Sequence, residues 1–543
     1  MTKATGQSQQ IQPAPMQYQP RGERRVIQCY DPQGFQTPTN PGVRSLVKMP
    51  DNPGTSDLMN DPVAWKKAIE TMVSAHGRAG VDTIVSCVFS RFATNLPPSV
   101  TQVAEPIFSQ VGWVKPLEAM QEAGYDYMQI ALEQAHKDGM TFLAGLRMND
   151  RHGQSKTAKV YLEHPEWHLE GIAGGFDYSQ EGVRQHMLSF VKDVLDHYDV
   201  DGLEYDYMRM IHVFPLGTGP ENAPLLTEFH RRTREILDKA GRKRGRKLEL
   251  GVRVPHVLSH CHDVGFDVEA WIKEGLVDYV VPAHFGHTDF NTRVEDFREL
   301  TEGTDCRVYP STGGYNWTGP SRLKSYRPKH FYAAAHNWYG FGADGIEIYN
   351  YQYISWELRL EKLRDLTPMR DPRTLAEYDR HYPFWRLLPR QDIHYESINE
   401  GTMTYDVIQL DRTEQDPRGT FDFRLAEDLA DPKLSAMMEF KAVGMTEEDA
   451  IVVTLNGKTV PDDLVERVYI WDGTNHEGDV TRNGDVYLEH HRGNPEPYYL
   501  CRLPLSAPPI VFGDNQLAIR LSGSSGTEGV ITIEEVNVKV HVK

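Results

Sequence analysis

The stretch Val200-Asp-Gly-Leu-Glu-Tyr-Asp-Tyr-Met-Arg209 decides both the fold and the candidate chemistry of this 543-residue chain. Its apolar and aromatic residues alternate with glycine and carboxylates, and successive side chains of a β-strand point to opposite faces. The pattern predicts a strand whose leucine and two tyrosines face covering helices. Gly202, Glu204 and Asp206 then share the other face, with the carboxylates toward the C-terminal end of the strand.

Short apolar runs and helical stretches alternate on both sides of this strand. Eight strand–helix repeats over roughly 340 residues match the number and size of a (β/α)8 (TIM) barrel, an α/β fold. A doubly wound open sheet is the alternative, but it would carry a glycine-rich phosphate-binding turn, and none is present. The predicted strands are Val26–Tyr30, Thr83–Phe89, Thr141–Met148, Val200–Tyr207, Leu248–Val254, Tyr279–Pro282, Arg307–Tyr309 and Gly345–Tyr349. The predicted helices are 62–78, 125–138, 181–198, 223–240, 267–275, 293–301, 328–340 and 354–365.

The sequence divides into four parts. Residues 1–24 are rich in Gln, Pro and Ser and predict a disordered lead, and 25–365 form the barrel. A stretch rich in Arg, Asp, Pro and Tyr predicts a linker over 366–399. Residues 400–543 carry short β-branched segments separated by turn residues, which predicts an all-β, jelly-roll-like sandwich domain. This domain lacks a cluster of carboxylates or nucleophiles, so we expect it to act in stability or substrate retention.

Composition excludes several classes of protein. The formal net charge of −19 argues against a nucleic-acid partner, because phosphate binding requires a basic face. The basic run Arg242-Lys-Arg-Gly-Arg-Lys247 is local and predicts a solvated loop after a helix. No apolar run of about 18 residues predicts a membrane span. The lead does not resemble a signal peptide, so localisation stays open: cytoplasmic for this sequence, exported if a signal has been trimmed.

The alternation rule places polar residues of other strands on the barrel axis as well. Arg147 and Asn149 point inward from the third strand, Arg253 from the fifth and Glu347 from the eighth. Catalytic residues of TIM barrels lie at the C-terminal ends of strands. The positive charges of two arginines nearly balance the negative charges of three carboxylates, and buried charges require such pairing. The alternative is an ion-pair layer that only fills the barrel.

The loops after the strands carry the remaining candidates. The second and third strand–helix connections, about 92–124 and 149–180, are long, and long loops in compact domains are usually functional. The cluster His256-x3-His260-x-His262-Asp263 follows the fifth strand, but its spacing is a poor zinc signature. Aromatic residues that could pack on sugar rings are expected in the later loops, namely Tyr315, Trp317, Trp338, Tyr339, Tyr351 and Tyr353.

We assign Asp206 and Glu204 as the catalytic carboxylates, with Glu347 and Asp150 in reserve. Glycosidic cleavage uses one protonated and one ionised carboxyl group, and crowding of two carboxylates separates their pKa values. The arginines would keep one of them ionised. The predicted substrate-binding residues are Arg147, Asn149, Arg253, His256, His284, Tyr315, Trp317, Trp338 and Asn350.

Three stretches resemble a known family. The first resembles the family-10-like glycosyl-hydrolase barrels and consists of Asp177-Tyr-Ser, Val183-Arg and Val191 to Arg209. Members of that family carry an active-site carboxylate at the position of Asp206. Leu146-Arg-Met-Asn-Asp-Arg-His152 and Gly342-Ala-Asp-Gly-Ile-Glu-Ile-Tyr-Asn350 are similar to the same group. The chain departs from the pattern at Glu204, where many members have histidine. The C-terminal region resembles galactose-binding-like jelly rolls through Val453-Thr-Leu-Asn-Gly457 and Gly513-Asp-Asn-Gln-Leu-Ala518.

The resemblance implies a glycoside hydrolase acting on a poly- or oligosaccharide, with no cofactor and no metal. Two other functions stay open. One is a non-catalytic carbohydrate-binding protein on a hydrolase-like barrel, and the other is a metal-dependent hydrolase such as a deacetylase. The sequence does not give the sugar, the linkage, the stereochemical outcome or the oligomeric state.

Overall fold

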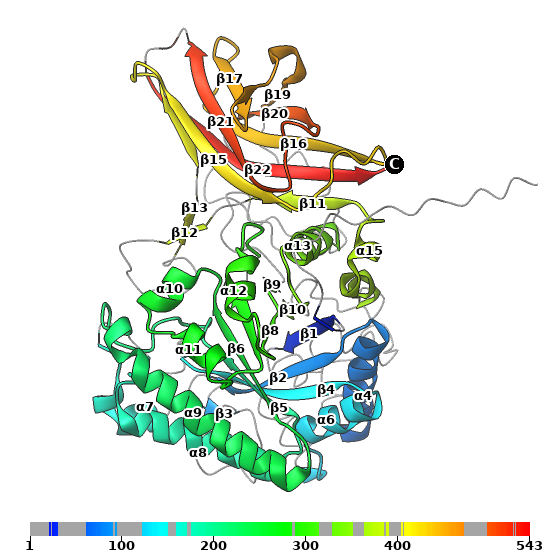
Figure 1. The fold of residues 1–543 in the computed structure, drawn as a ribbon, viewed down its shortest axis with the longest axis vertical. Coiled ribbons are helices and arrows are strands. Elements are labelled where there is room, and N and C mark those ends of the chain that lie inside the picture. The colour runs from blue at the N-terminus through cyan, green and yellow to red at the C-terminus, as the bar shows by residue number, and fades with distance from the viewer. Residues whose placement is uncertain are drawn as a thin grey trace, which may run out of the picture.

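An α/β unit and an all-β unit make up the chain, and Figure 1 shows the second stacked on one side of the first. Most of the predicted lead 1–24 and most of the predicted loop 92–124 fall outside the described residues, as do 150–158 and 171–174 of the other long loop. The computed structural model describes residues 21–22, 24–30, 61–90, 93–94, 122–149, 159–170, 175–284, 288–313, 328–350, 363–384, 387–389, 403–405, 407–471, 497–524, 526 and 528–543.

The α/β unit is built on one sheet of parallel strands in the order β8-β7-β6-β5-β4-β2-β1-β10-β9, with the short β3 (Ala93–Thr94) paired antiparallel to β2. Neighbours in this order are also neighbours in the chain, as a (β/α)8 barrel requires. All eight predicted barrel strands are confirmed. Their bounds are β1 Arg25–Tyr30, β2 Thr83–Ser90, β4 Thr141–Arg147, β5 Gly202–Asp206, β6 Glu249–Pro255, β7 Tyr279–Ala283, β8 Arg307–Val308, β9 Ser311–Gly313 and β10 Gly345–Tyr349.

The sheet closes through a strand that is broken in two. β8 pairs with β7, whereas β9, which follows directly in the chain, pairs with β10. Pro310 lies in the break, where it has no N–H to donate to a ladder. Its carbonyl oxygen still accepts a hydrogen bond from the Glu347 amide at 3.0 Å. β8 and β9 are therefore the halves of the seventh strand, and β10 closes the barrel by pairing with β1.

Helices cover the outside of the barrel, and those predicted over 62–78 and 328–340 begin and end at the predicted residues. The helix predicted over 354–365 lies mostly outside the described residues, and a 3-10 helix, Arg364–Arg370, follows it. The helices are α4 Pro62–Arg78, α6 Tyr127–Lys137, α7 Lys159–Glu163, α8 Glu181–His197, α9 Gly219–Arg244, α10 Leu258–Asp263, α11 Val268–Lys273, α12 Val294–Leu300, α13 Pro328–Gly340 and α15 Pro372–Leu375, with a 3-10 turn at Pro165–Trp167.

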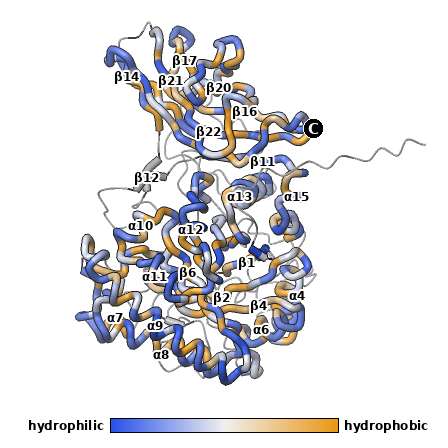
Figure 2. Tube along the Cα trace, viewed as in Figure 1, coloured by the Kyte–Doolittle hydropathy of each residue, from blue (hydrophilic) through white to orange (hydrophobic). Residues whose placement is uncertain are grey.

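Two apolar layers result from the alternation of side chains along the strands. One face of each strand packs on the helices: Tyr205 OH contacts Thr233 Oγ1 on α9 at 2.8 Å, and Tyr207 OH contacts His230 Nε2 at 3.0 Å. The other face fills the barrel interior with a smaller cluster that includes Ile27. Figure 2 shows the hydrophobic strands inside and many hydrophilic residues along the outer helices. The predicted orientation of the fourth strand is therefore confirmed.

Among the described residues, the all-β unit has two large antiparallel sheets, one ordered β11-β22-β16-β20-β19 with β14 on β22, the other β15-β21-β17-β18, and a two-stranded sheet, β12-β13. Segments predicted as strands from 450 onward are strands. The bounds are β11 Arg380–Pro383, β12 Leu387–Pro389, β13 Met403–Tyr405, β14 Ile408–Asp411, β15 Arg418–Leu425, β16 Leu434–Val443, β17 Ala450–Leu455, β18 Lys458–Thr459, β19 Glu466–Ile470, β20 Tyr498–Leu505, β21 Gly513–Gly523 and β22 Val530–Val542, with a 3-10 turn at Asp462–Leu464.

β11 lies in the stretch predicted as a linker, yet it pairs antiparallel with β22. The domain boundaries themselves stay a prediction. Within the described part of the chain, no helix is long and apolar enough to cross a membrane.

Buried polar contacts join the two units. Arg424 of β15 reaches Glu295 of α12 with a contact of 3.0 Å between Nη1 and Oε2 and a second, shorter one to Oε1. Asn337 of α13 donates to Arg424 O at 2.9 Å and accepts from the Ala426 amide at 2.7 Å. The guanidinium of Arg424 also lies 4.1 Å from the ring centroid of Phe341. The barrel therefore depends on the β unit to compensate a buried carboxylate.

Arg424→Met tests this dependence. Removing one partner of a buried ion pair typically costs about 3 kcal/mol or more, because the other charge stays buried. We expect the free energy of unfolding, measured by urea denaturation, to fall by about that amount. Arg293→Ala is the matched control, since Arg293 also approaches Glu295 but its side chain is 51% exposed; that change should cost less than about 1 kcal/mol. Equal effects of both variants would contradict the interpretation.

Candidate active site

Arg253, which is fully buried on β6, lies at the centre of the charged cluster in the barrel. Its Nη1 is 3.1 Å from Asp206 Oδ2 on β5, and its Nε is 2.8 Å from Glu347 Oε1 on β10. Ser311 of β9 donates to the same Glu347 oxygen at 2.9 Å and accepts from Arg253 Nη2 at 3.4 Å. The structure thus brings together the inward residues that alternation picked on three different strands.

Glu204 lies deeper in the barrel than Asp206, because it precedes it by two residues on the same face of β5. Its Oε2 accepts a hydrogen bond from Tyr279 OH at 2.8 Å, and its side chain is fully buried. The Tyr279 ring fits only because residue 251 is glycine: a Cβ there would lie 2.0 Å from Cζ of the ring. Gly251 is therefore what lets Tyr279 reach Glu204.

One proton in this cluster is required by electrostatics. Burial raises the pKa of Glu204 well above its ordinary range, and Glu347 raises it further against the opposing effect of Arg253. Burial also raises the pKa of Glu347, while Arg253 and hydrogen bonds from Ser311 and Glu204 lower it. Among the described residues, Glu204 Oε1 and Glu347 Oε2 have no hydrogen-bond donor. We infer that Glu204 carries this proton and shares it with Glu347, because burial raises the pKa of Glu204 well above its ordinary range.

Arg253 stays charged throughout. Burial opposes its charge, but Asp206 and Glu347 raise its pKa above the ordinary value. Its guanidinium carbon also lies 3.9 Å from the ring centroid of Tyr349, whose hydroxyl accepts from Arg147 Nη2 at 3.1 Å. Tyr349 therefore stands between the two predicted arginines.

Asp206 is the cluster carboxylate nearest the mouth of the barrel, as the last residue of β5. Its Oδ1 accepts a hydrogen bond from the Met208 amide at 2.9 Å, which fixes the carboxylate at the strand end. It is 4% exposed, whereas Glu204 and Glu347 are completely buried. A substrate entering from the strand ends would meet Asp206 before either glutamate.

Asn149 is buried and hydrogen-bonded to the backbone of two loops. Its Nδ2 donates to Phe176 O at 3.1 Å and to His212 O at 2.9 Å, and its Oδ1 accepts from the Phe176 amide at 2.9 Å. The amide thus ties two loops together at the mouth of the barrel, and the predicted contact of Asn149 with a sugar stays a prediction. Asn350 is 2% exposed at the end of β10, with a left-handed φ of 53° that asparagine tolerates.

The histidine cluster after β6 is dispersed. His256 Nε2 is 2.9 Å from Asp289 Oδ2, and the rings of His256 and His284 have centroids 5.8 Å apart. The His262 side chain is 76% exposed. Within the described residues, no group of three or more His, Cys, Asp or Glu side chains is arranged to hold a metal ion.

The loop placement predicted for Trp338 and Tyr339 is wrong. Both lie on α13 and are 1% exposed in the core, and Tyr339 OH donates to Met369 O at 2.8 Å. The helix α13 is buried along almost its whole length, from His330 to Gly340. Four other candidates, Asp150, Tyr315, Trp317 and Tyr351, lie outside the described residues, as does Tyr353.

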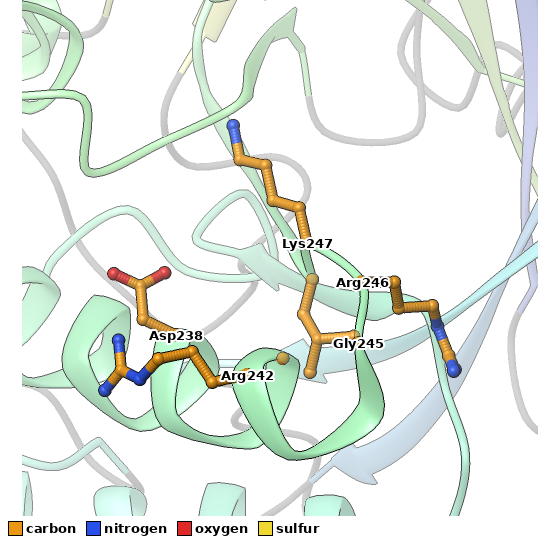
Figure 3. Close-up of a pocket in the computed structure, with 7 residues that line it drawn as sticks. Asp238, Arg242, Gly245, Arg246 and Lys247 are labelled. Carbon is orange, nitrogen blue, oxygen red and sulfur yellow. The ribbon is translucent and has the colours of Figure 1, made fainter.

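The basic run at the end of α9 lines a cavity of about 370 Å³ on the opposite end of the barrel, where β6 begins. Figure 3 shows the Arg246 and Lys247 side chains extending in different directions from the loop. Arg246 pairs with Asp199 at 2.7 Å, and Lys247 pairs with Asp278. Carboxylates therefore already match the charges of Arg246 and Lys247.

One curated relative of low identity is a glycosyl hydrolase. No family model matches the chain. The glycosyl hydrolase DigH of Escherichia coli is 21% identical over 254 residues, covering 37% of this chain and 56% of the relative, so the match spans about half of that protein. The PgaB glycoside hydrolase domain of Bordetella bronchiseptica has a TM-score of 0.40 at 11% identity, over 64% of this chain and 99% of the other. Tryptophan synthase of Mycobacterium tuberculosis reaches 0.31 at 12% identity, over 65% and 91%. Because both TM-scores are low, the assignment of a barrel fold rests on the strand order of the parallel sheet and not on these neighbours.

Glu204→Gln tests the protonation of the cluster. Above the ordinary glutamate pKa of 4.5, the unfolded chain releases a proton that buried Glu204 keeps, so the wild type loses stability as pH rises toward the folded pKa. Glutamine cannot ionise in either state. We expect the free energy of unfolding of the variant to depend less on pH between about pH 4 and pH 8, and to equal or exceed that of the wild type at the upper end.

Glu347→Gln is the matched control, because it removes a charged partner of buried Arg253. It should lower the free energy of unfolding at neutral pH by about 2 to 3 kcal/mol. If Glu204→Gln destabilises the protein as much as Glu347→Gln does, the assignment of a shared proton to Glu204 is wrong.

Proposed function

We propose that this chain is a glycoside hydrolase acting on a poly- or oligosaccharide, with Asp206 as the carboxylate that meets the glycosidic bond. The observation that carries the proposal is the position of Asp206: it ends β5 at the mouth of a (β/α)8 barrel and pairs with buried Arg253. Active sites of this fold lie at that end of the strands. The low-identity relative, a glycosyl hydrolase, supports the same class of chemistry.

Glu204 is the proposed second carboxylate. Glycosidic cleavage uses a protonated carboxyl group for the leaving oxygen and an ionised one as nucleophile or base. The raised pKa of Glu204 supports the protonated role, and the Arg253 pair supports the ionised role of Asp206. Because Glu204 is fully buried, it would hold a proton for the site, with Glu347 as its hydrogen-bond partner. Glu347 and Asp150 remain the reserve carboxylates, and Asp150 lies outside the described residues.

The remaining substrate contacts would come from the mouth. Arg147 and Tyr349 border the cluster, and His256 and His284 follow β6 and β7. These side chains would hold sugar hydroxyls through hydrogen bonds. The C-terminal unit resembles galactose-binding-like domains in sequence, and we propose that it helps to retain the same saccharide.

The alternative is a non-catalytic carbohydrate-binding protein. It is favoured by one observation, the complete burial of Glu204, Arg253 and Glu347, which is also expected of an ion cluster that only fills the barrel. Binding of glycans without release of reducing ends would support it.

Asp206→Asn tests the assignment. An amide of equal size cannot transfer a proton or attack, so we expect kcat to fall about a thousandfold or more with the fold intact. The assay is a screen of glycans for released reducing ends. Asp201→Asn is the control, because Asp201 lies at the other end of β5 and pairs with His136 at 2.9 Å. If Asp206→Asn keeps more than about a tenth of wild-type kcat, a loss under ~1.4 kcal/mol, Glu347 becomes the better candidate.

A further inference from the structure

A cavity of about 610 Å³ lies between the barrel and the β unit. One wall comes from the segments that follow β6 and β7, and the other comes from β15, β21 and the turn after β17. This volume is within the range of roughly 300–1,000 Å³ that small-molecule sites occupy. The polar residues that define the cavity, called here the interdomain pocket, include His256, His260, Asn291, Asp422, Asn456 and Gln516.

The interdomain pocket borders the mouth of the barrel. His256 directly follows β6, only three residues after Arg253, and its amide donates to Ala283 O at the end of β7 at 3.1 Å. Asp289, which also lines the pocket, holds the His256 ring at 2.9 Å. The pocket is therefore a neighbour of the Asp206 cluster on the end of the barrel where substrates bind.

The wall from the β unit is fixed by hydrogen bonds. Asp422 and Gln516 are paired residues of β15 and β21, and Gln516 Nε2 donates to Asp422 Oδ1 at 2.9 Å. The Gln516 amide donates to Asn456 Oδ1 at 2.8 Å. From the barrel side, Asn291 accepts from the Arg424 amide at 2.9 Å. A wall whose side chains are already ordered loses little conformational entropy when a ligand binds.

The charges of the interdomain pocket favour a neutral ligand. Arg424 is paired with Glu295 and with Asp514, the latter at 2.6 Å, and His256 is paired with Asp289. Of the other charged lining residues, Arg293 is paired with Asp296 at 3.3 Å, and the Asp422 carboxylate accepts from Gln516 at 2.9 Å. Burial lowers the pKa of His260, and the nearby His256 lowers it further, so its ring is neutral at neutral pH. A neutral imidazole and an amide each offer a donor and an acceptor, as sugar hydroxyls require of their partners.

We propose that the interdomain pocket is a second saccharide-binding subsite, which holds a neutral sugar unit of the same chain whose glycosidic bond lies at Asp206. This inference rests on the proposed function for the identity of the chain being cleaved. It gives the β unit a defined task, since Asp422, Asn456 and Gln516 form half of the subsite. Longer saccharides would bind more tightly than short ones for this reason.

The test uses the full chain and native gels that contain a neutral soluble polysaccharide: mixed-linkage β-glucan, arabinoxylan, galactomannan or glycol chitin. One variant changes each wall, Gln516→Ala and His260→Ala. We expect at least one polysaccharide to retard the wild type, and each variant to bind it about fivefold or more weakly, the effect of losing a hydrogen bond or two. Thr420→Ala is the matched control, because Thr420 is exposed on the same face of β15 as Asp422 but outside the pocket.

The outcomes separate the inference from the proposed function. Retardation that both pocket variants lose, without cleavage by the wild type, supports the subsite and contradicts the hydrolase. Where cleavage occurs, the pocket variants should raise KM for the polymer and leave kcat on a short aryl glycoside unchanged. A polymer that is cleaved and bound equally by wild type and both variants overturns the subsite alone. If only an anionic polymer such as alginate retards the wild type, the proposal of a neutral ligand is wrong. If no polymer retards the wild type and none is cleaved by it, both proposals are contradicted.

Discussion

The structure of the barrel interior depends on one buried positive charge, the guanidinium of Arg253. Arginine stays protonated in proteins, so a fully buried Arg253 requires negative partners at short distance. Asp206 and Glu347 supply them from β5 and β10, which are brought to the same depth only when the barrel is closed. The two carboxylates already exceed the single charge of Arg253. Among the described residues Glu204 forms no ion pair with an arginine or lysine, and burial raises its pKa well above the ordinary range, so we infer that Glu204 is the group that keeps a proton. One cluster thus holds carboxyl groups in both of the states that glycoside cleavage uses.

Much of the fold could be predicted from the spacing of apolar residues along the sequence. β-strand alternation and the 3.6-residue helical period predict all eight barrel strands and both ends of α4 and α13. Proline explains two differences. Helix α9 starts at Gly219 rather than at 223, because Pro224 reads as a break although it lies in an early turn. Pro310 ended the predicted seventh strand, and the structure continues it beyond the proline as β9. β16 was missed because its Met, Glu, Lys and Ala residues are not typical of strands.

The candidate site was predictable where alternation alone decides it. The rule that selects Glu347 also selects Tyr349, two residues later on the same face, and Tyr279 could have been found by applying it to β7. Ser311 lay beyond the predicted end of its strand. The rule says nothing about hydrogen bonds to loop backbone, so the bonds of Asn149 to Phe176 O and His212 O were not predictable from it. The interdomain pocket combines segments more than a hundred residues apart, and no local pattern indicates such a contact.

The most direct measurement of the central claim is a neutron crystal structure at neutral pH, which locates deuterons on individual oxygen atoms. The account predicts one deuteron on the Glu204 carboxyl group, directed at Glu347, and a fully deuterated Arg253 guanidinium between Glu347 and Asp206. Ionised carboxylates at both Glu204 and Glu347, or a deuteron on Asp206 in place of Glu204, would contradict it.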